Sequence, residues 1–259
     1  MIEKNTYIKL IIIVVIFFTF MFLIIGIPNI KEKKYESTII VGNGTVWNYH
    51  DKKWVNITSN RSIQNLNWKK YKVFINNIKL GDYYLWKDDK WYAFDDKKNA
   101  INLDGYLLAY LANYDLKVFN FSEDAIINRI YVDEVLRQNG LSVDSKFTSS
   151  SKISFDFDND GFIEDFYLIS NVFPEDFNPD NIFSIVFMVK NDEIYPIYTD
   201  VNSNQGLNGC MPRLRSFLDV NADNTSELIL SCARYSMGGV VDMLYEFKNG
   251  EFKILISNQ

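Results

Sequence analysis

The C-terminal part of the chain contains the same pattern twice, and this repeat restricts the fold more than any other feature. The segment SFDFDNDGFIEDFYLIS, from Ser154, aligns with FLDVNADNTSELILSC, from Phe217. After each segment comes a second match, VKNDEIYPIY from Val189 with FKNGEFKILI from Phe247. The Asn-Asp and Asn-Gly dipeptides are typical of tight turns with positive φ. Each copy is therefore predicted to run strand, acidic loop, strand, strand, tight turn, strand.

Both acidic loops carry side-chain oxygens at alternating positions. The first loop offers Asp156, Asp158, Asp160 and Glu164, and the second offers Asp219, Asn221, Asp223 and Glu227. Alternate positions of a curled loop can point inward together, and Ca²⁺ takes roughly six to eight oxygen ligands. The backbone carbonyls of Phe162 and Thr225 are placed to complete the two rings. The pattern predicts Ca²⁺ sites, and the alternative is a pair of acidic surface turns whose Asp and Asn residues bind local backbone donors.

The loops do not fit an EF-hand, which needs flanking helices and a Glu where this chain has Tyr167 and Leu230. The spacing D-x-[DN]-x-[DN]-G-x-x-[DE], followed directly by a strand, resembles the calcium loops of FG-GAP and VCBS-type repeats. These are the blades of integrin-α-like β-propellers. The resemblance covers residues 151–259 and implies structural Ca²⁺ held by the side chains above. We expect weaker binding in the second loop, which has Asn224 in place of Gly161 and one carboxylate fewer.

Near the N-terminus, residues 10–27 read LIIIVVIFFTFMFLIIGI, without a charge. A run of this length can span a bilayer, and the large residues at its end are unlike a signal-peptide cleavage site. We predict an uncleaved single-pass anchor. Lysines lie on both sides, so charge leaves the orientation open. A short tail before the span and calcium loops after it favour an extracytoplasmic C-terminal domain.

The remaining chain is predicted to be mainly β. Aromatic hairpins are expected around Asp51–Lys53 and Asp88–Asp89, and one soluble helix is expected from Ser122 to Gly140. The hairpins would have to supply further blades if an irregular propeller closes. The predicted regions are a tail and anchor (1–30), an aromatic hairpin region (31–121), a helix with a connector (122–150) and two repeats (151–259).

Cysteine, histidine and tryptophan residues bear on other roles. Cys210 and Cys232 are the two cysteines, and they fit either one disulfide or two buried thiols. His50 is the single histidine and has no acid or Cys partner evident from the sequence, so no catalytic residue is predicted. The tryptophans fill either the core or a surface on which sugars or peptides stack; they are Trp47, Trp54, Trp68, Trp86 and Trp91.

The sequence thus predicts a membrane-anchored, extracytoplasmic, calcium-binding β-repeat protein. Its formal charge of −6 and the lack of Lys/Arg clusters beyond short runs argue against a nucleic-acid partner, since phosphate binding needs a basic face. The resemblance implies a binding or adhesion module with a protein or glycan ligand. Two alternatives stay open: an anchored enzyme or binder that acts on cell-surface or cell-wall glycans, and a structural subunit of a membrane assembly.

Overall fold

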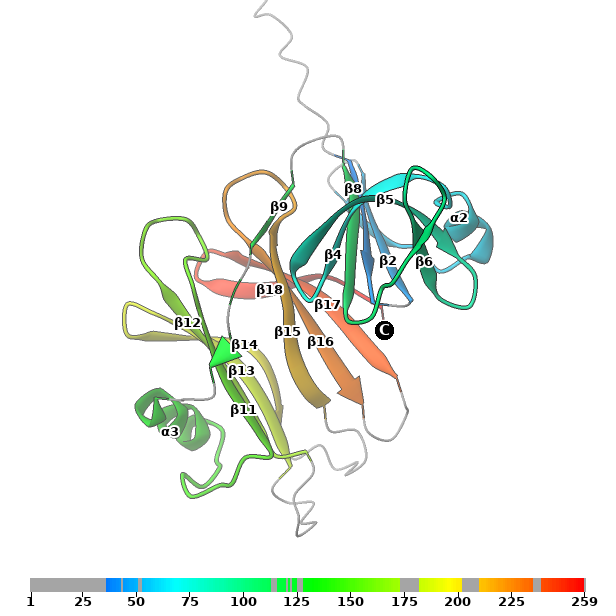
Figure 1. The fold of residues 1–259 in the computed structure, drawn as a ribbon. Helices are drawn as coiled ribbons and strands as arrows, with labels where there is room; N and C mark the ends of the chain where they lie inside the picture. The colour runs from blue at the N-terminus through cyan, green and yellow to red at the C-terminus, as the bar shows by residue number, and fades with distance from the viewer. Residues whose placement is uncertain are drawn as a thin grey trace, which may run out of the picture. The chain divides into compact units, whose positions relative to one another are not determined.

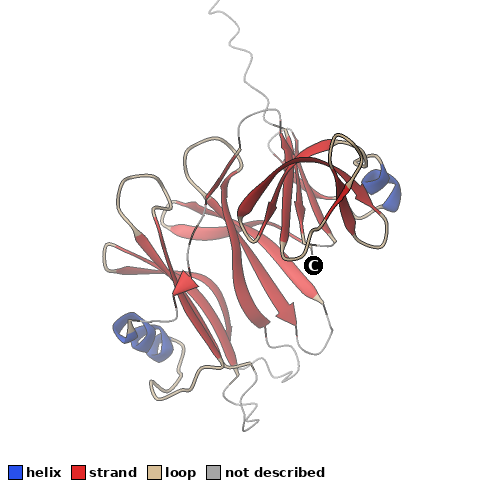
Figure 2. Ribbon diagram, in the orientation of Figure 1, coloured by secondary structure: helices blue, strands red, loops and turns tan. Residues whose placement is uncertain are grey.

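The computed structural model describes residues 36–42, 44–50, 53–112, 116–119, 121, 123–124, 128–172, 182–201, 210–234 and 239–258. These residues form three antiparallel sheets and two short helices (Figures 1 and 2). The predicted mainly β class is confirmed. The described part has two helices where one soluble helix was expected, α2 (Asn60–Gln64) and α3 (Arg129–Gln138).

The N-terminal sheet has eight strands in the order β3-β2-β1-β8-β4-β5-β6-β7. The strands are β1 (Ser37–Val41), β2 (Thr45–His50), β3 (Lys53–Asn56), β4 (Lys70–Ile75), β5 (Ile78–Lys87), β6 (Trp91–Phe94), β7 (Ala100–Ile101) and β8 (Leu107–Ala112). Strand β2 pairs with β3 and β5 pairs with β6, so both predicted aromatic hairpins are present. They belong to one sheet and are not separate blades.

Each predicted repeat forms four consecutive antiparallel strands, joined at one edge by a short extra strand. The first repeat sheet consists of β10 (Glu123–Asp124), β11 (Ser149–Phe155), β12 (Glu164–Ser170), β13 (Phe183–Lys190) and β14 (Glu193–Val201). The second repeat sheet consists of β9 (Lys117–Phe119), β15 (Cys210–Asp219), β16 (Glu227–Arg234), β17 (Val240–Lys248) and β18 (Glu251–Ser257). The predicted tight turns have positive φ, at Asn191 and Asp192 in one copy and at Asn249 and Gly250 in the other.

The second repeat sheet packs on both of its faces. On one face, Phe217 meets Phe166 of the first repeat sheet, with ring centroids 4.9 Å apart. On the other face, Leu218 and Ile229 pack with Trp47 of the N-terminal sheet. Such two-sided burial explains why Phe217 and Leu218, neighbours on β15 that point to opposite faces, are both fully buried. The described residues show no closed propeller.

Helix α3 begins later than predicted. Its N-cap is Asn128, whose side chain accepts the backbone N–H of Ile130 at 3.1 Å. Ser122, the expected cap, lies outside the described residues, and Glu123–Asp124 pairs with β11 as strand β10. Sheet pairing here overrides helical periodicity. The helix buries Val132, Val135 and Leu136 against the outer face of the first repeat sheet.

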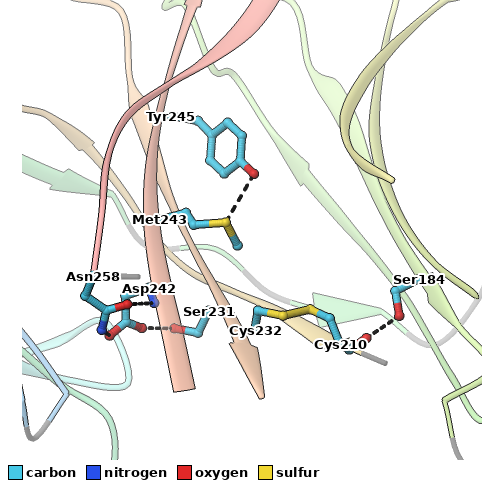
Figure 3. Close-up of a disulfide and its surroundings, with 8 residues drawn as sticks. All are labelled: Ser184, Cys210, Ser231, Cys232, Asp242, Met243, Tyr245 and Asn258. Atoms are coloured by element: carbon cyan, nitrogen blue, oxygen red, sulfur yellow. Dashed lines mark hydrogen bonds between the residues drawn. A yellow bond between two sulfur atoms is a disulfide. The ribbon is translucent and has the colours of Figure 1, made fainter. Parts of the chain in front are cut away.

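A disulfide joins Cys210 of β15 to Cys232 of β16, so the bridge is the alternative that the structure contains (Figure 3). Both residues are buried. The hydroxyl of Ser184, on β13, donates a hydrogen bond to the backbone carbonyl of Cys210. This contact ties the disulfide to the first repeat sheet.

The apolar segment 10–27 lies outside the described residues, so its predicted role as an anchor stays a prediction. Within the described ranges, the structure contains no helix with the length and apolar character needed to cross a bilayer.

Candidate metal centre

The two acidic loops occupy equivalent places in the two repeat sheets. The first connects β11 to β12, and the second connects β15 to β16. In both cases the last acidic residue, Glu164 or Glu227, is also the first residue of the following strand and is fully buried. The strands therefore fix the two ends of each loop and point one carboxyl group inward.

In the first loop, hydrogen bonds to carboxylates curl the backbone. The carboxylate of Asp156 accepts the N–H groups of Asp160 and Gly161, both at 3.1 Å. The Oε2 atom of Glu164 accepts the N–H of Phe157 at 2.7 Å and so closes the loop across its neck. These carboxylates accept hydrogen bonds from backbone N–H groups that would otherwise have no partner in the turn.

The second loop repeats this framework. Asp219 accepts the N–H groups of Asp223 and Asn224, both at 3.1 Å. Glu227 Oε2 accepts the N–H of Val220 at 2.8 Å. The structure therefore supports the predicted alignment of the two loops at the level of single hydrogen bonds.

Positive φ values also recur at matched positions. Asn159 has φ 57° and Ala222 has φ 59°, while Gly161 has φ 89° and Asn224 has φ 70°. Glycine adopts this region without steric cost, and Asn tolerates it better than most residues. The replacement of Gly by Asn in the second loop therefore preserves the loop's path.

Three carboxylates converge in the first loop. Ligand oxygens of Asp156, Asp158 and Glu164 all lie within 4.8 Å of one another. The Oδ1 atom of Asp158 is buried and accepts no hydrogen bond from a described residue, whereas the buried Oε1 atom of Glu164 has only an ammonium beside it, described below. Oxygens at this separation can coordinate one hard cation after small side-chain adjustments. Asp160, the fourth predicted ligand, lies at the loop's exposed side.

A lysine that the sequence pattern did not indicate supplies positive charge to this group. The Nζ atom of Lys190, at the end of β13, lies 2.8 Å from Asp160 Oδ2 and 3.1 Å from Glu164 Oε1. It also donates a hydrogen bond to Asp158. The pairing of β12 with β13 brings Lys190 beside the loop, although it is far from the loop in sequence.

The pKa values reflect this cluster. Burial raises the pKa of the Glu164 carboxyl, although the N–H of Phe157 and the ammonium of Lys190 act in the opposite direction. Burial alone would lower the pKa of Lys190, but its hydrogen bonds to the surrounding carboxylates outweigh burial and raise it. The hydrogen bond from Lys190 lowers the pKa of Asp160. The ammonium and the carboxylates therefore stabilise each other's charged forms.

The second loop is closed differently. Asn221 stands where the first loop has Asp158, and its Nδ2 atom donates to Asp223 Oδ2 and Glu227 Oε1, both at 3.0 Å. Burial raises the pKa of Glu227 to about 9. Within the described residues, a convergent group of three acidic side chains is found in the first loop and not in the second. Thus an amide donates to the carboxyl groups of the second loop, whereas an ammonium contacts those of the first.

The structure also describes the two residues whose carbonyl oxygens were predicted as ligands, and the single histidine. Phe162 and Thr225 each donate a backbone N–H to the Asp two residues earlier, at 2.9 and 2.8 Å. Ligation by their carbonyl oxygens stays a prediction. His50 has an acidic neighbour that the sequence did not reveal, because its Nδ1 atom lies 2.9 Å from Glu36 Oε1 in an exposed pair.

Comparison of the chain with protein-family models, curated proteins and solved structures finds no match.

Proposed function

We propose that the chain is a calcium-stabilised β-repeat protein whose first acidic loop binds one Ca²⁺ ion. The observation that carries this proposal is the convergence of Asp156, Asp158 and Glu164 within 4.8 Å. The Oδ1 atom of Asp158 is buried and accepts no hydrogen bond from the described residues, and Glu164 Oε1 lies against the ammonium of Lys190, so both oxygens favour a positively charged partner. The first loop thus has the charge and an open acceptor, as a hard cation requires.

The second loop serves as an internal comparison for this proposal. It has the same backbone framework, but Asn221 donates to both neighbouring carboxyl groups. Its side-chain oxygens already have partners, so a cation would have to break these hydrogen bonds. We therefore propose a structural role without metal for the second loop.

The proposed setting is the outer side of a membrane, with residues 10–27 as the anchor. Loops of this kind in extracellular modules bind Ca²⁺ with dissociation constants of about 10⁻⁴–10⁻³ M, which suits calcium outside a cell. The Cys210–Cys232 disulfide is consistent with an oxidising compartment. We propose that the two repeat sheets are blade-like units of the FG-GAP or VCBS type and that the displayed module binds a partner.

Removing calcium is expected to lower the melting temperature of the full-length protein in detergent. With a dissociation constant of about 10⁻⁴–10⁻³ M, 10 mM Ca²⁺ contributes about 1.4–2.7 kcal/mol of stability. For a chain of this size that is a shift of roughly 3–10 °C. Differential scanning calorimetry in Ca²⁺ and in EGTA measures it. Identical melting in the two buffers would refute structural calcium.

Lys190 must leave its position when a cation enters, because both would contact the same oxygens. Its side chain is 16 % exposed and its ammonium contacts Glu164, which is fully buried. Without the ammonium, the Glu164 carboxylate is a buried charge with no counter-charge among its described contacts. Lys190 therefore stabilises the metal-free loop and competes with the metal for it.

Replacing Lys190 with Met is expected to strengthen Ca²⁺ binding about tenfold, because the cation no longer has to break hydrogen bonds to charged groups. The same change should lower the melting temperature in EGTA, since Glu164 loses its ion pair. Isothermal titration calorimetry and melting curves measure the two effects. Lys248 is the equivalent, exposed residue of the second copy, and Lys248→Met is the control that should change neither. Unchanged affinity in Lys190→Met would contradict competition.

A further inference from the structure

The five tryptophans divide between the core and the surface. Trp47 and Trp91 are buried and Trp54 packs partly buried against the core, whereas Trp68 is 47 % exposed and Trp86 is 37 % exposed. The rings of Trp68 and Trp86 lie side by side, with centroids 5.5 Å apart, and Phe94 lies 5.2 Å from Trp68. We call these three residues the aromatic platform. Exposed large apolar groups that cluster in this way commonly mark binding surfaces.

The sheet places the rings of Trp86 and Tyr92 on one outer face. On β5, Leu85 points into the core, so its neighbour Trp86 points the opposite way. The register of β5 and β6 pairs Trp86 with Tyr92. Paired residues of antiparallel strands project from the same face, so Tyr92 extends the row of rings beyond Trp86.

Trp68 has a backbone conformation that is unfavourable for a bulky side chain. Its φ is 60°, and among the described residues with positive φ it is the one aromatic residue. Its N–H donates to the carbonyl of Leu85 at 2.7 Å, and Asn67 accepts the N–H of Lys87 at 2.8 Å. A bulky residue in this region is strained, and such strain is concentrated at functional sites. A Gly or Asn would meet the backbone requirement with less strain, but would not supply the ring.

A polar cavity adjoins the platform through Tyr92. The cavity has a volume of about 440 Å³, and its lining includes Tyr92, Asn102, Asp104 and Trp91. Asn102 donates to Asp104 at 2.6 Å, which leaves further acceptor positions on that carboxylate. Lys90 also lines the cavity. The cavity lining thus contains both an ammonium donor and carboxylate acceptors.

Acidic and basic side chains are mixed near the platform. Lys70 forms an ion pair with Asp96 at 2.7 Å, Tyr92 donates to Asp89 at 2.8 Å, and Lys90 lies over the ring of Tyr92. The surroundings therefore lack the excess of positive charge that binds phosphate or an anionic lipid surface. A neutral ligand with both apolar and hydroxyl-bearing faces fits this combination.

We propose that the aromatic platform and the adjoining cavity bind a neutral oligosaccharide. The C–H face of a pyranose ring is weakly positive and stacks on the negative face of an indole. Its hydroxyl groups can donate to the Asp104 carboxylate in the cavity. The proposal rests on the binding role proposed above and supplies its ligand class, but it uses neither acidic loop.

The test is titration of the full-length protein in detergent with cellohexaose, chitohexaose and mannohexaose, followed by tryptophan fluorescence and calorimetry. At least one of them should bind, and Trp86→Ala should weaken that binding at least tenfold without lowering the melting temperature. Ile78→Ala, which changes an exposed residue of the same strand, is the control and should have no effect. Binding by none of the three sugars, or binding that survives Trp86→Ala, would overturn the proposal.

Two further arms distinguish sugar binding from the calcium site and from a lipid surface. Titration in EGTA should leave sugar binding in place, so that loss of the calcium proposal and loss of the sugar proposal are distinguishable. Sedimentation with phosphatidylcholine vesicles tests a lipid surface instead. A Trp86-dependent association with vesicles, together with no sugar binding, would reassign the platform to the membrane interface and refute the oligosaccharide.

Discussion

Replacing Glu227 with Gln is expected to make the protein a few kcal/mol more stable than the wild type at pH 8 in calcium-free buffer. The Glu227 carboxyl is fully buried, and burial raises its pKa from an ordinary value of 4.5 to about 9. In the unfolded chain the group ionises near 4.5, so the folded state holds a proton that the unfolded state has lost. Gln resembles the neutral carboxyl and keeps an acceptor for the N–H of Val220. The Asn221 amide loses its bond to Glu227 Oε1 but keeps its bond to Asp223, so the gain from removing the buried charge is larger than this loss.

The sign of the pH dependence follows from this difference. The stability that Glu227 contributes is fully present below pH 4.5 and is lost as pH rises through about 9. The slope is about 1.4 kcal/mol for each pH unit between these values. Urea unfolding of the wild type and Glu227→Gln from pH 5 to 8 measures it. We expect the variant to have the flatter profile.

Glu164→Gln is the matched control, because Glu164 occupies the same position in the first loop. Its carboxylate is paired with the ammonium of Lys190 at 3.1 Å. The ammonium opposes the rise that burial causes in the pKa of Glu164, and neutralising the carboxylate leaves Lys190 less well compensated, so this variant should gain much less stability at pH 8 than Glu227→Gln. The same substitution is thus expected to have unequal effects in the two loops. Equal effects of the two substitutions would contradict the different environments described above.

Much of the repeat could be predicted from local sequence. The strand patterns, the turn dipeptides at Asn191 and Asn249 and the left-handed residues at Gly161 and Asn224 are all present in the structure. These features depend on residues close together in the chain, where hydrophobic alternation and turn chemistry act directly. The position of each acidic loop between two strands followed from the same signals.

Features that depend on distant residues could not be predicted in this way. Lys190 lies beside the first loop because β13 pairs with β12. In the second loop the Asn221 amide donates to Glu227, and residue spacing does not show which way this side chain points. The predicted start of α3 was wrong because β10 gains hydrogen bonds from β11, which local periodicity cannot show. The exposure of Trp68 and Trp86 depends on which face of the sheet is covered.

The central claim is that the first loop binds Ca²⁺ and the second does not. The loops differ at Asp158 and Asn221, and substitutions at these two positions have the largest expected effects on Ca²⁺ binding. Asp158→Asn removes one ligand charge from the first loop. Because ligand charge count sets calcium affinity, it should weaken binding at least tenfold. Asn221→Asp removes the amide that donates to Asp223 and Glu227 and adds a carboxylate, so it should create a second site.

The most direct measurement is therefore the number of Ca²⁺ ions bound per chain, from isothermal titration calorimetry of the wild type and these two variants. We predict one ion for the wild type, weak or no binding for Asp158→Asn, and two ions for Asn221→Asp. Absence of binding in the wild type, or wild-type affinity in Asp158→Asn, would contradict a calcium site in the first loop.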